Sequence, residues 1–249
     1  MRRFKIDAGT ITDSTCDISG PDARHMISVL RLKTGDRVVL FDGAGWEYPS
    51  TIQKISSGQV RLGVLDKRRG LTESPALITV AQGFLKDKKM DALIRQLTEL
   101  GISRWVPFCS ARSVARPDAA RLAKRTERWC KIATEALKQC RRSQPPEIAP
   151  AADFAAVLRA AAPAAVKLIF WEAESVPIQA VASGAAPHGE VFLILGPEGG
   201  FGRSEIDQAR RAGFKSVSLG PRILRAETAA LAAAALAQFL FGDLGNDQD

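Results

Sequence analysis

The sequence has few of the residues on which several classes of protein depend. Among 249 residues there are four cysteines, two histidines and one tyrosine. The cysteines show neither paired metal-ligand spacing nor the density of a secreted disulfide scaffold, which predicts reduced thiols and no bound metal. No apolar run reaches the roughly eighteen residues that a membrane helix needs, and no signal peptide is evident. These absences predict a cytoplasmic protein that does not enter a membrane.

Two common phosphate-binding patterns are missing as well. No G-x-G-x-x-G follows a predicted strand, and the sequence contains no G-x-x-x-x-G-K-[ST]. The absence of both predicts that any ligand site is not built for a pyrophosphate. The length allows one large or two modest domains, which can bury most of their apolar surface without covalent staples.

Glycine and proline gather in two loops near the end of the sequence. The apolar run 191–195 predicts a strand covered on both faces, and it leads into G-P-E-G-G at 196–200. A second strand, expected over 215–219, leads into L-G-P-R-I-L-R-A-E-T-A at 219–229. Glycine lets main-chain groups approach a ligand without a Cβ in between. Because ligands bind at the carboxyl edge of a parallel sheet, the two loops predict one binding site there.

Helices are predicted after each of these loops. Ser204 and Asp207 have N-cap spacing for a short helix that ends near Gly213. An alanine-rich helix is expected over 226–241, with Gly242 as its stop. This order of strand, loop and helix is typical of an α/β fold with a mostly parallel sheet.

The first 72 residues follow a different pattern. A helix is expected over 23–30, and hairpin turns separate short alternating strands that we expect over 37–41, 47–55 and 59–65. The pattern predicts a small β-barrel, and an OB-like or SH3-like barrel fits it equally well. A boundary near 71–75 then divides the chain into domains 1–72 and 73–249.

Basic residues are concentrated in one segment. The net charge is +8, and residues 112–142 contain ten lysines and arginines but only three acids. A solvated helix face is one interpretation of such a run. A one-sided basic stripe is also typical of nucleic-acid binding. If about four of these side chains neutralise phosphates, the affinity should fall with a log-log salt slope of about three to four, without selecting a base.

The two loops together resemble a known family. G-P-E-G-G-F followed by L-G-P-R-I-L-R-x-E-T-A is similar to the carboxyl-terminal signature of the RsmE family. These are S-adenosylmethionine-dependent methyltransferases of the SPOUT superfamily that methylate N3 of a uridine in small-subunit ribosomal RNA. Segments 25–36, 90–101, 110–113 and 139–142 resemble further parts of the family pattern. Four side chains depart from its common residues, and no role is assigned to them: Gln96, Ala111, Lys138 and Ala226.

The resemblance implies a complete architecture. A PUA-like RNA-binding β-barrel domain over 1–72 precedes a SPOUT methyltransferase domain over 73–249. The latter is an α/β domain with a mostly parallel sheet and a deep trefoil knot, which no periodicity could predict. The implied cofactor is S-adenosylmethionine, and no metal is expected. The implied partners are 16S ribosomal RNA, free or within the small subunit or its precursor, and a second copy of the chain.

Site residues follow from the same resemblance. Leucine and isoleucine would form an apolar slot for the adenine, and glycine main-chain groups would supply its hydrogen bonds. The expected cofactor contacts are Leu195, Gly196, Gly200, Leu219, Gly220, Ile223, Leu224, Arg225 and Thr228. The expected RNA contacts are His25, Arg31, Lys86, Lys89, Arg112, Arg125, Arg128 and Arg142.

The chemistry of methylation at N3 suggests two catalytic candidates. The negative charge that develops on the uracil carbonyls needs a donor, and Arg225 offers one with fixed N–H groups. Its alternative role is an ion pair with Glu198 or Glu227. Glu198 could accept a proton or hold a main-chain turn. Neither His25 nor His188 is expected to act as a base, so the proton acceptor stays unassigned.

Two other functions stay open on the residues alone. One is another SPOUT RNA methyltransferase, acting on a ribose 2′-oxygen or a different base. The other is a non-catalytic RNA-binding factor in ribosome assembly.

Overall fold

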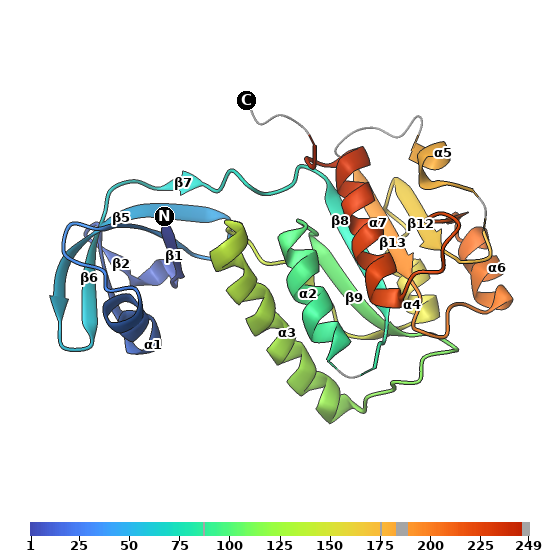
Figure 1. The fold of residues 1–249 in the computed structure, drawn as a ribbon, viewed down its shortest axis with the longest axis horizontal. Helices are drawn as coiled ribbons and strands as arrows, with labels where there is room; N and C mark the ends of the chain where they lie inside the picture. Colours follow the sequence, from blue (N-terminus) through green and yellow to red (C-terminus); the bar gives the residue numbers. More distant parts are fainter. Residues whose placement is uncertain (87, 175, 183–188, 246–249) are drawn as a thin grey trace. The chain divides into compact units, whose positions relative to one another are not determined.

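The structure is a computed structural model that describes residues 1–86, 88–174, 176–182 and 189–245. The chain forms two compact units. The first contains Met1–Glu73 together with Leu137–Pro145, and the second contains Ser74–Ala136 and Pro146–Asp249. Each unit is built on its own sheet (Figure 1). The segment Leu137–Pro145 therefore joins strands that lie far before it in the sequence, which hydropathy patterns did not indicate.

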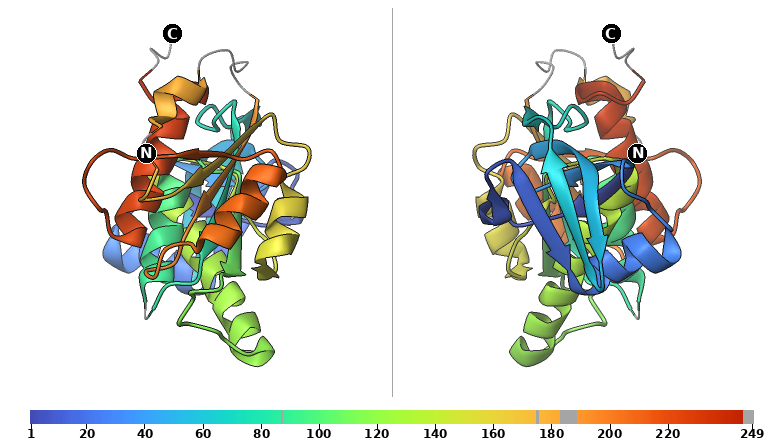
Figure 2. Two further views of the ribbon diagram at one scale, coloured as in Figure 1. Left: turned by 90° about the vertical axis from the view of Figure 1, so that its right-hand side faces the viewer. Right: turned by 90° about the vertical axis from the view of Figure 1, so that its left-hand side faces the viewer.

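A mostly antiparallel sheet forms the first unit. Its strand order is β1-β4-β5-β6-β3-β2, and β1 and β4 are its one parallel pair among the described strands. The three strands expected from the alternating pattern are present as β4, β5 and β6. The right-hand view of Figure 2 has this sheet facing the viewer. The bounds are β1 Arg2–Lys5, β2 Ile11–Thr12, β3 Thr15–Ser19, β4 Arg37–Phe41, β5 Trp46–Ser56, β6 Gln59–Val64 and β7 Arg68–Arg69, which pairs with β5.

The helix of the first unit begins earlier than the sequence predicted. It starts as α1 (Gly20–Arg24) and continues as a π-helical turn, η2 (His25–Val29), while a short 3-10 turn, η1 (Ala8–Thr10), follows β1. Proline in the first turn suits a helix start, because it has no N–H and the N–H groups of the first turn have no partner within the helix. Ala23 and Met26 are fully buried against the sheet, which leaves His25 exposed between them.

An all-parallel sheet forms the second unit. The strand order is β10-β9-β8-β13-β12-β14, and β11 pairs with β9. The bounds are β8 Leu77–Gly83, β9 Arg104–Cys109, β10 Glu147–Ile148, β11 Ala152–Asp153, β12 Val166–Phe170, β13 Glu190–Leu195 and β14 Lys215–Val217. The sheet order places the carboxyl ends of β12, β13 and β14 side by side.

Helices cover both faces of this sheet. Helices α2, α3 and α7 lie on one face of the sheet, and α4 and α6 lie on the other (Figures 1 and 2). Val191, Leu193 and Leu195 on β13 belong to the core with the first three helices, whereas Phe192 and Ile194 pack with the other two. A strand covered on both faces is apolar at every position, which explains the continuous run in the sequence. The bounds are α2 Lys89–Glu99, α3 Ala119–Cys140, α4 Phe154–Ala160, α5 Ile178–Ala182, α6 Arg203–Arg211 and α7 Ala226–Phe241.

The N-cap of helix α6 lies two residues before the expected cap. It is Gly202, and the buried Glu205 accepts the Gly202 amide N–H at 3.0 Å. Ser204 and Asp207 lie within the helix, so their predicted capping role is wrong. Helix α7 has the predicted bounds, and β14 ends at Val217, two residues short of the prediction. In the part of the chain that the structure describes, no helix is long and apolar enough to cross a membrane. The trefoil knot stays a prediction.

Candidate functional site

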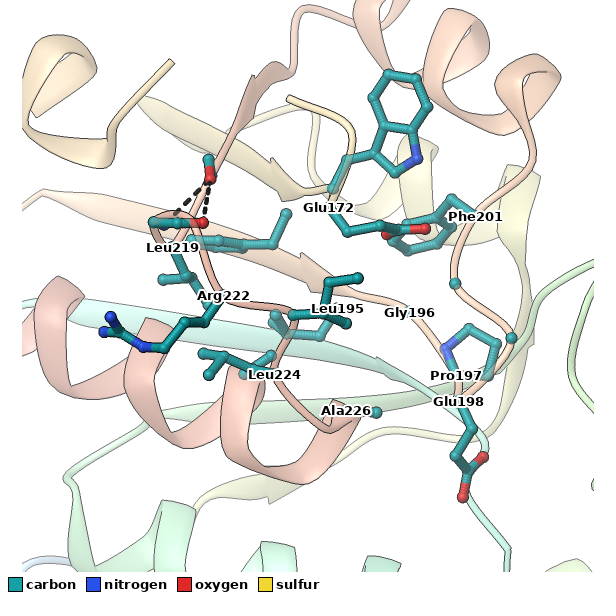
Figure 3. Close-up of a pocket in the computed structure, with 18 of the residues that line it drawn as sticks. Glu172, Leu195, Gly196, Pro197, Glu198, Phe201, Leu219, Arg222, Leu224 and Ala226 are labelled. Atoms are coloured by element: carbon teal, nitrogen blue, oxygen red, sulfur yellow. Dashed lines mark hydrogen bonds between the residues drawn. The ribbon is translucent and has the colours of Figure 1, made fainter. Parts of the chain in front are cut away.

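A cavity of about 290 Å³ lies at the carboxyl edge of the parallel sheet (Figure 3). Three consecutive sheet neighbours provide its walls, because the loops after β12, β13 and β14 all face it. Their lining residues are 170–172, 195–201 and 218–224, and Ala226 and Ala229 of α7 complete it. The two glycine-bearing loops expected at one site are thus joined there by a third, 170–172.

Most of the expected cofactor residues line this cavity. They are Leu195, Gly196, Gly200, Leu219, Gly220, Ile223 and Leu224. Arg225 and Thr228 lie outside its lining and are exposed, Arg225 as the N-cap of α7. The walls combine aliphatic side chains with glycine main chain, a composition that suits an adenosyl group. The individual roles of these residues stay predictions.

Close packing of main chain explains the glycines of the β13 loop. A Cβ on Gly196 would lie 3.2 Å from Cε2 of Phe201 and 3.4 Å from the main chain of Gly200. Gly200 has a φ of +63°, which favours glycine. A Cβ on Gly83, at the end of β8, would lie 2.7 Å from the nitrogen of Pro197. The loop therefore packs directly on the main chain of the neighbouring strand.

A buried glutamine fixes the start of the same loop. Gln82 is fully buried on β8, and its Nε2 donates to the carbonyl oxygens of Gly196 at 2.9 Å and Gly83 at 3.0 Å. Buried polar groups are normally hydrogen-bonded, yet the Gln82 Oε1 has no partner among the residues described. Sequence reasoning missed this residue. The signal was a single amide side chain at the end of an otherwise apolar strand.

Lys89 joins the two glycine-bearing loops. Its Nζ lies 3.2 Å from Oε1 of Glu198, in the β13 loop, and 3.3 Å from Oε2 of Glu227, in the first turn of α7. Glu198 also accepts the Lys86 main-chain N–H at 3.0 Å. Lys89 was expected to contact RNA, and the structure instead shows it bridging two carboxylates that belong to the cavity loops.

This pairing also sets the charge of Glu198. Partial burial acts to raise the pKa of Glu198, but the main-chain N–H groups of Lys86 and Glu198 and the Lys89 ammonium outweigh it and hold the pKa below the ordinary value. The hydrogen bonds that Lys89 donates to Glu198 and Glu227 raise the pKa of Lys89 despite desolvation. A carboxylate held ionised in this way is a poor proton acceptor, which favours the structural role for Glu198.

Loss of the Lys89 bridge should loosen both loops. Lys89→Met keeps the apolar stem and removes the charge, so we expect a small but measurable fall in the free energy of unfolding, as is usual for partly exposed ion pairs. Urea unfolding measures this change. Lys88→Met is the matched control, because Lys88 is exposed and its side chain makes no bond within the described residues. An equal loss of unfolding free energy in Lys89→Met and Lys88→Met would contradict a stabilising role of the bridge.

The bridge also predicts a pH dependence. The lowered pKa of Glu198 means that its stabilisation is present above its usual value of 4.5 and is lost as the pH falls through the lower folded value. The raised pKa of Lys89 means that its contribution is present below 10.5 and is lost as the pH rises through the higher folded value. The difference in unfolding free energy between wild type and Glu198→Gln should thus be constant from about pH 5 to 9, shrink in stronger acid, and shrink again in strong base where Lys89 loses its charge. Urea unfolding across a pH series measures it, and a change of that difference around pH 7 would contradict the assignment.

Arg225 does not form the ion pair considered as its alternative role. Glu198 and Glu227 both pair with Lys89, and Arg225 makes no ion pair within the described part of the chain. Its guanidinium is therefore free to contact a ligand. Arg222, in the same loop, is exposed and lines the cavity.

A further loop, after β9, braces the β13 loop from the side. Nη1 of Arg112 donates to the Gly199 carbonyl at 3.3 Å, and Oε1 of Glu205 accepts the Ala111 main-chain N–H at 3.0 Å. Within the turn, the Ser113 hydroxyl accepts the Ser110 N–H at 3.0 Å. Position 111 contributes its main chain to this contact, so the contact does not depend on the side chain that departs from the family pattern.

The remaining expected RNA residues have different surroundings. His25 and Arg31 are exposed in the first unit, and Lys86 is exposed before α2. Arg142 differs from them, because its side chain is 6 % exposed and its Nε lies 2.9 Å from Oε2 of Glu73. A buried and paired guanidinium cannot reach a phosphate without breaking that pair, so the structure gives Arg142 a role inside the first unit.

Helix α3 carries the basic segment. Arg128 pairs with Asp91 at 2.8 Å, and Asp91 also accepts the indole N–H of Trp129 at 3.0 Å. Lys124 and Arg125 make no ion pair with any described residue. The unpaired cations are therefore the ones best able to meet phosphates. His188 lies outside the described residues, and no group of metal-binding side chains occurs among those described.

The chain combines a parallel-sheet unit that has a loop-lined cavity with a smaller, mostly antiparallel unit. Known protein families match both parts. Residues 72–238 match the model of an RNA methyltransferase domain, and residues 18–65 match that of an RNA methyltransferase PUA domain. The first unit is thus PUA-like, and the second is a methyltransferase domain. The chain belongs to the ribosomal RNA small subunit methyltransferase E family, the RsmE family of the SPOUT superfamily.

Relatives match over almost the whole chain. Ribosomal RNA small subunit methyltransferase E of Bacillus subtilis is 30% identical over 94% of this chain and 93% of its own length. The crystal structure of the Neisseria gonorrhoeae protein of the same name, bound to S-adenosylmethionine, has a TM-score of 0.83 at 31% identity and covers 98% of this chain and 99% of that one. A Legionella pneumophila protein described as a methyltransferase, also with S-adenosylmethionine, has a TM-score of 0.85 at 31% identity, with coverage of 97% and 98%.

Proposed function

We propose that this protein transfers the methyl group of S-adenosylmethionine to N3 of a decoding-site uridine in 16S ribosomal RNA. The observation that carries the proposal is the cavity at the carboxyl edge of the parallel sheet, walled by glycine main chain and aliphatic side chains from adjacent loops. Solved relatives with about the same fold hold S-adenosylmethionine, and the relatives are named as ribosomal RNA methyltransferases.

The residues of the cavity fit this cofactor. Leu195, Leu219 and Leu224 form an apolar slot of the kind that an adenine ring fills. Gly196 and Gly200 leave main-chain atoms bare beside it, because a Cβ at either position would press on a neighbour. Ile223 is 87 % exposed in the structure, so its side chain can close over a ligand. Thr228 and Arg225 would contact the ligand from the first turn of α7.

When bound, the sulfonium of the cofactor supplies an already activated methyl group. The protein then has two tasks, to align that methyl group with N3 and to stabilise the charge that appears on the uracil carbonyls. Alignment alone can lower a barrier by several kcal/mol. Arg225 can perform the second task, because its guanidinium has no competing carboxylate among the described residues and charge stabilisation by fixed donors is a large catalytic effect. Glu198 keeps the β13 loop in shape.

The RNA would be held by both parts of the chain. We assign residues 1–72 as the RNA-binding domain, with His25 and Arg31 as exposed contacts, and residues 73–249 as the catalytic domain. In the catalytic domain the phosphate contacts would come from Lys86, Arg112 and the unpaired cations of α3. The substrate would be the small ribosomal subunit or its precursor in the cytoplasm, with the enzyme acting as a homodimer.

A methyl-transfer assay tests the proposal. Small subunits or 16S RNA from cells that lack the modification should incorporate tritium from labelled S-adenosylmethionine, and mass spectrometry should find 3-methyluridine in the product. A ribose methyl would resist alkaline cleavage and would point to 2′-oxygen transfer instead. Absence of incorporation, together with no calorimetric signal for the cofactor, would favour a non-catalytic RNA-binding factor.

A further inference from the structure

Glu172 adds an unpaired carboxylate to the same cavity. It follows β12, in the loop that the two sequence motifs do not include, and lines the wall next to Trp171. Figure 3 shows its side chain beside Phe201, across the cavity from the labelled leucines. The other acidic lining residue, Glu198, is held by Lys86 and Lys89. Glu172 makes no hydrogen bond or ion pair with any residue in the described ranges.

The position of this carboxylate depends on Gly200. A Cβ at Gly200 would lie 2.7 Å from Oε1 and 3.3 Å from Oε2 of Glu172. The carboxylate therefore rests against the main chain of the β13 loop, and a side chain at position 200 would displace it. The glycine has a second reason to be there, its φ of +63°. Together these features place two acceptor oxygens at the wall where the β12 and β13 loops meet.

Glu172 is exposed, so water can hydrogen-bond its carboxylate until a ligand fills the cavity. An ionised carboxylate only accepts hydrogen bonds, and those from a charged or hydroxyl donor are strong when water is partly excluded. The other lining residues near it are aliphatic, aromatic or glycine, and the one cation of the lining is Arg222. Figure 3 shows Arg222 on the opposite side of the cavity from Glu172. A ligand that fills the cavity displaces that water from Glu172, and the ligand must then supply the donors itself.

We propose that Glu172 binds the methyl donor by accepting hydrogen bonds from its ribose hydroxyls or from its α-ammonium group. This inference rests on the proposed function, because it takes S-adenosylmethionine as the occupant of the cavity. The cofactor carries a net positive charge, so a carboxylate in the wall also favours it electrostatically. The cofactor is thus held by three loops, of which the sequence motifs identify two.

Isothermal titration of the full-length protein with S-adenosylmethionine tests the role of Glu172. Glu172→Gln should raise the Kd about tenfold or more, the usual effect of losing a charge-assisted hydrogen bond. The melting temperature without ligand should not change, because the side chain has no partner to lose. Glu190→Gln is the matched control, since Glu190 is an exposed carboxylate at the other end of β13, and its Kd should equal that of wild type.

A fragment of the cofactor separates the two donors. 5′-Methylthioadenosine keeps the ribose and lacks the amino acid part. A matching loss of affinity for this fragment in Glu172→Gln identifies the ribose hydroxyls, and an unchanged affinity for it identifies the α-ammonium.

The outcomes also separate this inference from the proposed function. Wild-type binding of S-adenosylmethionine with an unchanged Kd in Glu172→Gln overturns the inference and leaves the proposed function standing. A loss of kcat at unchanged Kd likewise overturns it and places Glu172 in proton transfer instead. Failure of wild type to bind the cofactor overturns both.

Discussion

Gly196→Val should abolish S-adenosylmethionine binding, with a rise in Kd of at least about a hundredfold. The Cβ alone would come within 3.2 Å of the Phe201 ring, tighter than a normal contact. The two further methyl groups would crowd a loop whose main chain lines the cavity. A loss of this size corresponds to about 3 kcal/mol. Calorimetry measures the Kd directly.

The same variant should bind RNA almost normally. RNA contacts are expected from the first unit, from Lys86 and Arg112, and from α3, and none of these residues lines the cavity. Gly9→Val controls for the exchange itself, because Gly9 is exposed in the first unit and a Cβ there would meet only its neighbour Asp7, at 3.7 Å. If Gly196→Val loses RNA affinity as strongly as cofactor affinity, the β13 loop supports the whole unit and is not specifically a cofactor wall.

The sequence predicted the elements that have a strong local signal. The run 191–195 forms a strand because both faces of β13 are covered, and 226–241 forms α7 because alanine favours a helix and Gly242 ends it. The N-cap of α6 could not be predicted from local spacing. Glu205 selects Gly202 as the cap while also accepting the Ala111 N–H, a contact 94 positions away in the chain.

The site was predictable where it consists of main chain and not where it depends on side-chain partners. Glycine and proline mark loops directly in the sequence, so both motifs were found at one cavity. Lys89 looked like a free cation because its partners, Glu198 and Glu227, lie more than 100 positions away in the chain. Arg142 looked free for the same reason, and Glu73 pairs with it across 69 positions. Glu172 has no motif around it, and only the sheet order brings it to the cavity.

Removing the unpaired cations of α3 should weaken RNA binding and flatten its dependence on salt. The structure refines the choice of residues, because Arg128 is already paired with Asp91 whereas Lys124 and Arg125 make no ion pair in the described part of the chain. Lys124→Ala with Arg125→Ala should reduce the log-log slope of affinity against salt by about 2, one unit for each lost phosphate contact. The affinity at about 0.1 M salt should fall roughly tenfold or more.

A matched pair of cations on the opposite layer tests whether charge alone explains the effect. Arg211→Ala with Lys215→Ala removes the same charge from the end of α6 and the start of β14, where both side chains are exposed. If non-specific attraction alone holds the RNA, the two double variants should have the same RNA affinity and the same salt slope. A smaller slope in the α3 variant alone means that phosphates lie along α3. Affinity for S-adenosylmethionine should stay at the wild-type value in both variants, because none of the four residues lines the cavity. Equal salt slopes of RNA affinity in the two variants would exclude α3 from the RNA interface.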